Sequence, residues 1–269
     1  MDLGLKGKRA LVTGASSGIG AAVALELAGE GVSVVVQGRD AERAHDIARR
    51  VEAKGVKAVV ALGDVCSDGD MDRVTEAAIE GLGGVDILVN CAGGVVRSDN
   101  PAWIDMSSAE WNHAFDFNVV SIIRLAQRLT PGMIERGWGR IINISSIAGG
   151  KLTGVLHDYG AVKAAVDHLT MNLSKTLAPK GVTVNAVIPG TVMTPQAERW
   201  IVTLRKQNGW SDDLDENQKI YTSKYAVQPI PRLGRAEEIA AAVTFLASPR
   251  SDYTTGALLR VDGGSSNGR

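Results

Sequence analysis

A tyrosine and a lysine stand four residues apart in the stretch HDYGAVKAAVDHL, residues 157–169. Tyrosine normally has a pKa of about 10, so at neutral pH its hydroxyl is a poor base and a weak acid. If the stretch is helical, Tyr159 and Lys163 share one face. An ammonium about 5 Å from the phenolate would stabilise it by ~3 kcal/mol at an effective dielectric constant of ~20. That energy lowers the pKa of Tyr159 by ~2 units, which predicts a general acid–base residue.

A serine precedes this pair by thirteen residues, just after the apolar run RIINIS at 140–145. The hydroxyl of Ser146 can hydrogen-bond a substrate oxygen and stabilise developing alkoxide charge. Ser145 is the neighbouring alternative. A packed tyrosine and a solvated lysine are the structural alternative for the pair itself. No spacing of His, Cys and carboxylate residues suggests a metal site, so we expect none.

The stretch LVTGASSGIG, residues 11–20, joins a predicted strand to a predicted helix. Gly14, Gly18 and Gly20 allow a tight turn and a close approach of the backbone to a ligand. The helix that follows offers free N–H groups and its positive dipole end to a pyrophosphate. Because the loop lies in a strand–turn–helix unit, it predicts a dinucleotide site.

The same stretch also fits the nucleophile elbow Gly-x-Ser-x-Gly of serine hydrolases. Ser16 would then be the nucleophile, with His157 or His168 as its base. The elbow normally follows several strands, one of whose loops supplies the oxyanion hole. Only about a dozen residues precede it here, which disfavours the hydrolase.

Seven short apolar runs alternate with amphipathic stretches along the chain. Continuous apolar character is typical of parallel strands covered on both faces. The β-α-β-α order predicts right-handed crossovers and one doubly wound sheet, in a single α/β domain over 1–269. Asp40, Ser67 and Ser107 are expected N-caps, and Pro195 an expected helix start. The predicted strands are 9–14, 32–37, 57–62, 86–90, 140–145, 182–188 and 257–262.

Residues 191–232 break this rhythm and are expected to contain no strand of their own. They carry Trp200, Trp210 and the acidic run DDLDE. A long insertion after a strand's carboxyl end predicts a substrate-binding lid, with a surface helical hairpin as the alternative.

Seven ordered motifs cover nearly the whole sequence: TGASSGIG, NCAG (90–93), FDFNVVS, NISS, YGAVK, IPGTVMT (188–194) and TGALLRVDGG. Together they resemble the short-chain dehydrogenase/reductase family, in its branch of roughly 250-residue chains, with Cys91 in place of the family's second Asn. The resemblance implies a Rossmann fold with a seven-stranded parallel sheet in the order 3-2-1-4-5-6-7. Members that resemble it include 3-oxoacyl reductases.

The resemblance also assigns residues. It implies a catalytic set of Asn118, Ser146, Tyr159 and Lys163, with Asn118 holding a water near Lys163. It allows 3-oxoacyl thioesters, steroids, sugars or small cyclic alcohols as substrates, and it implies a homotetramer. The cofactor-binding residues implied are Gly14, Ser16, Ser17, Gly18, Ile19, Gly20, Arg39, Asp64, Val65, Asn90, Ala92, Gly93, Tyr159, Lys163, Pro189, Gly190, Val192 and Thr194.

The end of the second strand, VVVQGRDAER, bears on the choice of nicotinamide cofactor. NAD-preferring folds place an acid there to bind the ribose 2′-hydroxyl. That position reads Gly38, and Arg39 follows, which can pair with a 2′-phosphate. Asp40 lies two residues late and is explained as a cap. We therefore expect NADP as the cofactor, with NAD as the alternative. If Arg39 has no role in cofactor binding, it is a solvated charge in the loop.

Composition and charge argue against nucleic-acid-binding and membrane proteins. A net charge of -1 and the lack of a basic run argue against nucleic acid or an anionic membrane as partner. No apolar run reaches the ~20 residues of a membrane helix, and the start is unlike a signal peptide, so we expect a cytoplasmic protein. The prediction is an NADP-dependent oxidoreductase that interconverts a secondary alcohol and a ketone. The alternatives are an NAD-dependent dehydrogenase of a diol or cyclic alcohol and, more remotely, a non-catalytic dinucleotide sensor.

Overall fold

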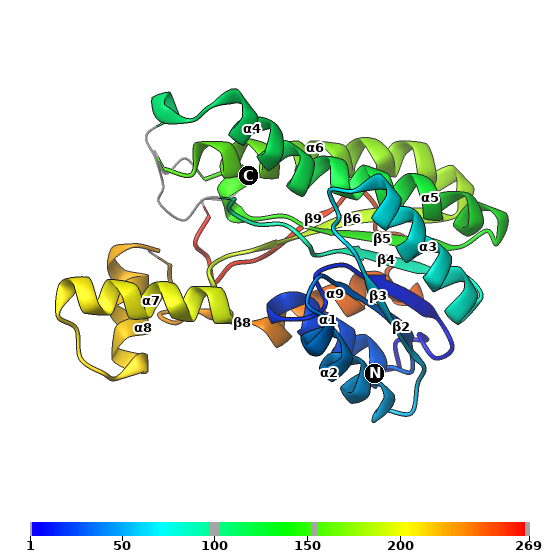
Figure 1. Ribbon diagram of the computed structural model, residues 1–269, viewed down its shortest axis with the longest axis horizontal. Coiled ribbons are helices and arrows are strands. Elements are labelled where there is room, and N and C mark those ends of the chain that lie inside the picture. Colours follow the sequence, from blue (N-terminus) through cyan, green and yellow to red (C-terminus); the bar gives the residue numbers. More distant parts are fainter. Residues whose placement is uncertain (1, 97–102, 152–154, 227, 267–269) are drawn as a thin grey trace.

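A computed structural model describes residues 2–96, 103–151, 155–226 and 228–266. Seven parallel strands form one sheet in the order β3-β2-β1-β4-β5-β6-β9 (Figure 1). The predicted order is confirmed, because β9 is the seventh strand of this sheet. All seven predicted strands are present: β1 (Arg9–Val12), β2 (Ser33–Gly38), β3 (Ala58–Leu62), β4 (Ile87–Asn90), β5 (Gly139–Ile144), β6 (Val182–Pro189) and β9 (Leu258–Val261).

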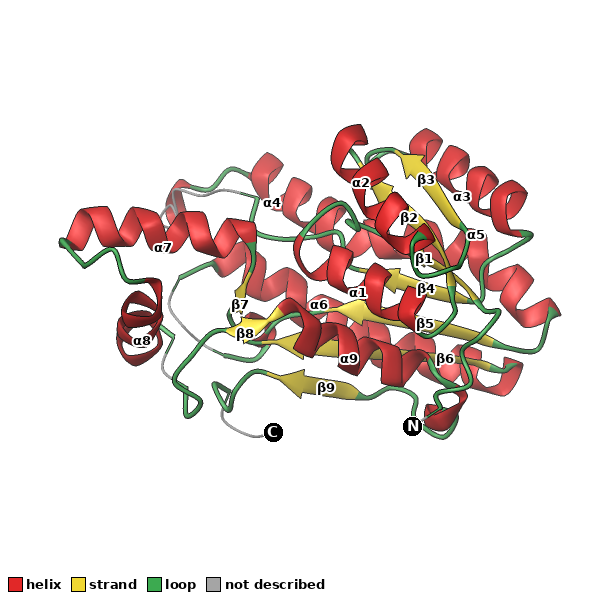
Figure 2. Ribbon diagram, turned by 90° about the horizontal axis from the view of Figure 1, so that it is seen from below, coloured by secondary structure: helices red, strands yellow, loops and turns green. Residues whose placement is uncertain are grey.

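Helices cover both faces of the sheet (Figures 1 and 2). One face packs against α1 (Gly18–Gly29), α2 (Ala41–Glu52) and α9 (Ala236–Ala247). The other packs against α3 (Asp68–Leu82), α5 (Ser121–Glu135) and α6 (His157–Leu177), with α4 (Ser108–Phe115) beside them. Because each face has its own apolar core, the strands carry apolar residues at successive positions. Short 3₁₀ turns lie at Trp103–Asp105, Ile147–Gly149, Ala178–Lys180 and Pro249–Ser251, and a π-helical turn lies at Asp116–Val120.

Local capping explains where several helices begin. The Asp40 carboxylate accepts from the Arg43 N–H, and the Ser67 hydroxyl accepts from the Asp70 N–H. Ser107 forms a reciprocal capping box with Glu110. These three predicted caps are confirmed. Pro195 is the first residue of α7, as predicted, while the residue before it supplies the cap.

The insertion over 191–232 departs from expectation in one respect. It contains a two-residue strand, β7 (Val192–Met193), which pairs with β8 (Gly234–Arg235) in a small second sheet. Two residues are too few for a period-2 pattern, so β7 could not be predicted from the sequence. Helices α7 (Pro195–Asn208) and α8 (Leu214–Lys224) make up most of the insertion. They project beyond the carboxyl ends of the strands, at the left of Figure 1. Their role as a lid stays a prediction.

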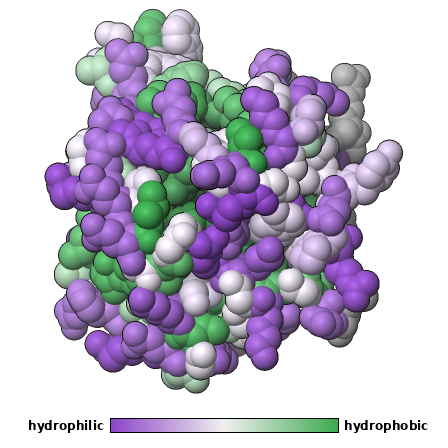
Figure 3. Space-filling view, turned by 90° about the vertical axis from the view of Figure 1, so that its right-hand side faces the viewer, coloured by the Kyte–Doolittle hydropathy of each residue, from purple (hydrophilic) through white to green (hydrophobic). Residues whose placement is uncertain are grey.

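The two edges of the sheet differ in character. At the carboxyl edge, loops after β1, β4, β5 and β6 gather beside α7 (Figure 2). At the amino edge, seen in Figure 3, hydrophilic side chains dominate and apolar ones are scattered. Among the helices described, none is long and apolar enough to cross a membrane.

Candidate active site

The glycine loop leaves β1 and enters α1 at the carboxyl edge. Gly14 and Gly18 both have positive φ, 63° and 56°, a region that glycine adopts without strain. Helix α1 begins at Gly18 with no side-chain cap from Ser17. The first N–H groups of a helix have no intrahelical partner, so this uncapped end is open to an anion.

Two polar residues hold the loop, and sequence reasoning missed both. Gln37 is buried in β2, where its Oε1 accepts from the Gly14 N–H at 3.1 Å and its Nε2 donates to Gly63 O at 2.7 Å. The Thr13 hydroxyl accepts from the N–H groups of Cys91 and Ala92, both at 2.9 Å. A glutamine ending the apolar run VVVQ was the available signal, since buried polar groups need partners.

The loop after β5 brings Ser146 to Tyr159. Ser146 caps the 3₁₀ turn Ile147–Gly149, and its Oγ accepts from the Ala148 N–H at 3.2 Å. That bond uses an acceptor site of Ser146 and leaves its own hydrogen free. Ser146 lies close enough to Tyr159 for its hydroxyl to lower the pKa of the phenol. A hydrogen-bond donor, Ser146, and an acid–base group, Tyr159, therefore lie side by side, where both can reach one carbonyl oxygen of a substrate.

Ser145, the alternative serine, points elsewhere. It is buried, and its Oγ donates to Lys163 O at 3.4 Å. The Asp167 carboxylate lies nearby; burial raises its pKa, and Ser145 offsets part of that rise. Ser145 therefore secures α6 against β5 and does not face the Tyr159 hydroxyl.

Lys163 lies under Tyr159 on the same face of α6. Its Nζ is 5.5 Å from the centre of the Tyr159 ring and donates to Ile144 O at 3.0 Å. The side chain is 4% exposed, and burial lowers the pKa of Lys163 to about 8. The thiol of Cys91 lies nearby, and burial raises its pKa to about 12, so it remains neutral.

The predicted fall in the pKa of Tyr159 is wrong for the protein alone. Burial raises that pKa, and Ser146 offsets only part of the rise. The Lys163 ammonium is directed at a backbone carbonyl and does not contact the phenolic oxygen. Desolvation therefore outweighs the ion's field.

Asn118 lies in the π-helical turn and is fully buried. Its Nδ2 donates to Gly94 O at 3.0 Å and Ala114 O at 3.1 Å, and its Oδ1 accepts from the Gly94 N–H at 2.9 Å. A Cβ on Gly93 would come within 2.9 Å of Asn118 Oδ1 and 3.4 Å of Lys163 Nζ. The amide thus holds the backbone loop beside Lys163, with both of its N–H donors in use.

At the other end of the loop, β2 and β3 end beside each other. A Cβ on Gly38 would lie 3.0 Å from Ser16 Oγ, so a larger residue there would displace the serine. Arg39 extends into solvent, with its Nη1 3.7 Å from Asp64 Oδ2. The Asp64 carboxylate also accepts from the Cys66 N–H at 2.9 Å, which shapes the turn that contains Val65.

The Pro189–Gly190 turn closes the remaining side. A Cβ on Gly190 would lie 2.9 Å from the Asp262 Cα, so the turn packs tightly on the strand end of β9. Across the loop, Thr194 lies within 3.5 Å of where a Gly18 Cβ would be. Thr194 also caps α7, and Val192 forms β7. The insertion is thereby anchored to the glycine loop.

Residues 14–266 match a family model described as enoyl-(acyl carrier protein) reductase. The 7alpha-hydroxysteroid dehydrogenase of Escherichia coli (strain K12) is 34% identical over 263 residues, 98% of this chain and 96% of the relative. The 3-oxoacyl-[acyl-carrier-protein] reductase of Pseudomonas aeruginosa is 37% identical over 262 residues, 97% and 98% of the two chains. The chain is a short-chain dehydrogenase/reductase. It is accordingly an NAD(P)-dependent oxidoreductase of hydroxyl and keto groups.

Solved members of the short-chain dehydrogenase/reductase family agree. The L-sorbose reductase of Gluconobacter frateurii, complexed with NADPH and L-sorbose, matches with a TM-score of 0.94, 33% identity and 100% coverage of both chains. A 7alpha-hydroxysteroid dehydrogenase complexed with NADH matches with a TM-score of 0.84 and 33% identity, covering 98% of this chain and 96% of its own. Both nicotinamide cofactors therefore occur among the solved relatives.

The site of this short-chain dehydrogenase/reductase fits a dinucleotide. The uncapped start of α1 suits a pyrophosphate, and Gly93 leaves the Lys163 side of the site open. The hydrolase alternative finds no support: Ser16 lies against Gly38, and His168 is exposed on α6, where it bonds Asn172.

Proposed function

We propose that the protein is an NADP(H)-dependent reductase–dehydrogenase that interconverts a ketone and a secondary alcohol, with Tyr159 as the general acid–base. The observation that carries this proposal is the position of the Tyr159 ring over the buried Lys163 ammonium, at 5.5 Å, with Ser146 close enough to lower the pKa of Tyr159. A bound nicotinamide supplies or accepts the hydride. The side chains transfer the proton and stabilise the charge on the substrate oxygen.

In the reducing direction Tyr159 donates its proton to the substrate oxygen. Ser146, whose Oγ accepts from the Ala148 N–H, donates its own hydrogen to the same oxygen and stabilises the charge that develops there. Lys163 stays mostly protonated at neutral pH, because its pKa of about 8 is above that pH. A neighbouring positive charge favours the phenolate once the proton has left Tyr159.

Asn118 holds the loop at Gly94 beside Lys163, where a water could pass protons between Lys163 and solvent. Since both N–H donors of its amide bind backbone carbonyls, a relay water beside Lys163 would have to bind an oxygen of Asn118 or of the backbone. A π-helical turn displaces main-chain carbonyls from their usual partners, which makes the backbone of Asn118 suited to that role.

The preference for NADP follows from the end of β2. Ser16 fills the space where a side chain at Gly38 would lie, so no acid can bind a ribose 2′-hydroxyl from that position. The Arg39 guanidinium is mostly exposed, and its 3.7 Å pair with Asp64 is weak enough to give way to a phosphate. The NAD-dependent alternative is supported by the same Asp64 carboxylate, because its negative charge would repel the 2′-phosphate of NADP.

The relatives act on several classes of substrate, and each class is a candidate for this protein. The relatives are named for a hydroxysteroid, a 3-oxoacyl carrier protein and L-sorbose. A panel with one ketone of each class, followed by nicotinamide absorbance, selects among them. The Tyr221 ring in the insertion stacks on Tyr225, which packs against Trp210. Trp210 is thus a packing residue of the insertion, whereas Trp200 is 46% exposed.

The test of the mechanism is Tyr159→Phe, which keeps the ring and removes the hydroxyl. Loss of a general acid–base group should lower kcat by about 10²–10⁴-fold while NADPH binding remains. Tyr253→Phe is the matched control, since Tyr253 is fully exposed. Near-parental turnover in Tyr159→Phe would refute the acid–base role, and unchanged NADPH binding with no turnover in the parent protein would favour the sensor.

A further inference from the structure

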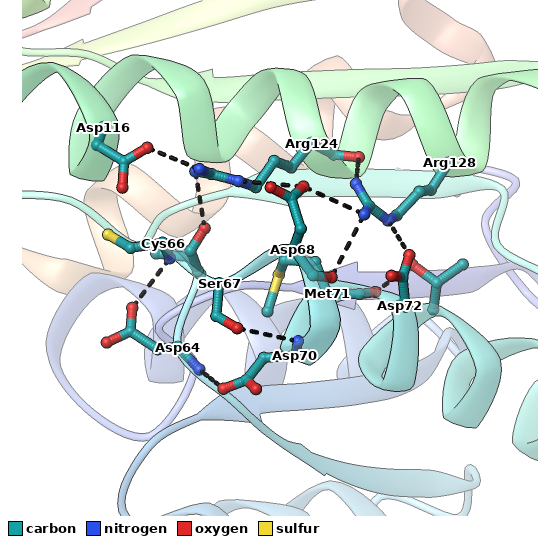
Figure 4. A network of polar contacts seen from close by, with 12 residues as sticks. Asp64, Cys66, Ser67, Asp68, Asp70, Met71, Asp72, Asp116, Arg124 and Arg128 are labelled. Atoms are coloured by element: carbon teal, nitrogen blue, oxygen red, sulfur yellow. Dashed lines mark hydrogen bonds and ion pairs between the residues drawn. The ribbon is translucent and has the colours of Figure 1, made fainter.

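Arg124 lies where three segments meet (Figure 4). The residue belongs to α5, and its side chain is only 13% exposed. Its Nη2 is 2.8 Å from Asp116 Oδ1 and its Nε is 3.3 Å from Asp68 Oδ1. Its Nη1 donates to Val65 O at 3.4 Å. One guanidinium therefore binds the turn after β3, the start of α3 and the π-helical turn.

Two of these segments belong to opposite ends of the proposed cofactor site. Val65 follows Asp64, which is expected at the adenine end. Asp116 opens the π-helical turn that holds Asn118 against Gly94, beside Lys163. Each turn also has hydrogen bonds of its own, because the Cys66 N–H donates to Asp64 and the Asn118 amide donates to Gly94 O.

The thiol of Cys66 lies in the same region. Burial, followed by the negative charges of Asp64 and Asp116, raises its pKa to about 12, so the thiol remains neutral. Carboxylates from both of the turns that Arg124 joins therefore act on this one thiol.

Arg128, one turn further along α5, provides a contrast. Its Nε is 2.7 Å from Asp72 Oδ1, and its Nη2 is 3.2 Å from Asp68 Oδ1 (Figure 4). Both acids belong to α3. Arg128 therefore fastens α5 to α3, as Arg124 partly does, but it forms no ion pair with Asp116 and no hydrogen bond with Val65.

We propose that Arg124 is a positioning residue that ties the adenine-side turn to the π-helical turn carrying Asn118. Binding of the adenosine part of the cofactor then holds the proton-transfer end of the site in place. The rigid, planar guanidinium has donors in fixed directions, which a flexible ammonium does not. This inference rests on the proposed function, because it assigns the two turns to the two ends of one bound dinucleotide.

The experiment compares Arg124→Met with Arg128→Met. Each variant removes an ion pair with Asp68 of α3 and one further ion pair, so both should lower the unfolding temperature to a similar degree. Only Arg124→Met should raise the Kd for NADPH and lower kcat, each by about tenfold, the effect of losing one charged hydrogen bond. Arg124→Lys should recover the unfolding temperature but not kcat. In combination with Asp116→Asn, the effects of Arg124→Met on kcat should be less than additive.

Several results would overturn the link. One is an equal effect of the two methionine variants on NADPH affinity and kcat. Another is an Arg124→Met variant that changes the unfolding temperature alone. The failure of the proposed function looks different, because the parent protein would then bind NADPH without turning over any ketone of the panel. In that case the two Kd values still test the adenine-side half of the link.

Discussion

Helix α1 contains two glycines whose replacement by alanine should have opposite effects. A Cβ on Gly20 would lie 2.3 Å from Gly14 O and 2.7 Å from Gly14 C, and both atoms are backbone. A Cβ on Gly29, at the other end of the helix, would have no atom within 4 Å. Both residues are helical, so helix propensity favours alanine at each. The difference between the two variants therefore isolates the contact with the loop.

The contact in Gly20→Ala cannot be relieved by rotating a side chain. Loop and helix must separate until the distance reaches at least 3.0 Å, below which Cβ contacts essentially do not occur. Such overpacking costs about 1–3 kcal/mol, which corresponds to a fall of roughly 2–10 °C in Tm for a chain of this size. The same shift moves the N–H groups at the start of α1. Losing one hydrogen bond to a charged phosphate raises the Kd for NADPH by about 10–100-fold.

Thermal unfolding and NADPH titration of both variants check these values. Gly29→Ala should keep the parental Kd and be unchanged or up to about 1 kcal/mol more stable. If Gly20→Ala binds NADPH as tightly as Gly29→Ala does, the close contact does not position the phosphate-binding end of α1, and the reasoning fails.

Two further predictions concern charge. Arg39→Met should reduce the preference for NADPH over NADH by about tenfold, because a 2′-phosphate loses its cation. Arg43→Met is the control, since it loses only a surface pair with Asp40. If the ratio of kcat/KM for NADPH to that for NADH is equal in the two variants, the assignment of Arg39 is contradicted. Glu238 accepts from Arg232 and from the Arg235 N–H, and these bonds lower its pKa from 4.5 to about 2. A depressed pKa gives stability that is present above pH 4.5 and lost as the pH falls toward 2. Glu238→Gln should therefore flatten the acid limb of a pH–Tm curve, by at most about 1 kcal/mol at this partly exposed site, whereas an unchanged curve would show that the pair contributes nothing.

The sequence by itself determined the architecture and the residues that meet at the carboxyl edge. Continuous apolar runs at 32–37 and 140–145 predicted covered parallel strands, and the strand–turn–helix context of the glycine loop predicted the dinucleotide end of α1. The caps at Asp40, Ser67 and Ser107 were also readable. These features depend on neighbours a few residues away, so their signals lie within short windows.

Only the tertiary structure decided what surrounds those residues. Burial reverses the expected pKa shift of Tyr159, and Lys163 donates to Ile144 O, nineteen residues away. The sequence shows a glutamine at the end of an apolar run, but only the fold shows that Gln37 holds the glycine loop through the Gly14 N–H and Gly63 O. Arg124 joins turns more than fifty residues apart. Desolvation and long-range hydrogen bonds depend on which segments the fold brings together, and no local window of the sequence contains that information.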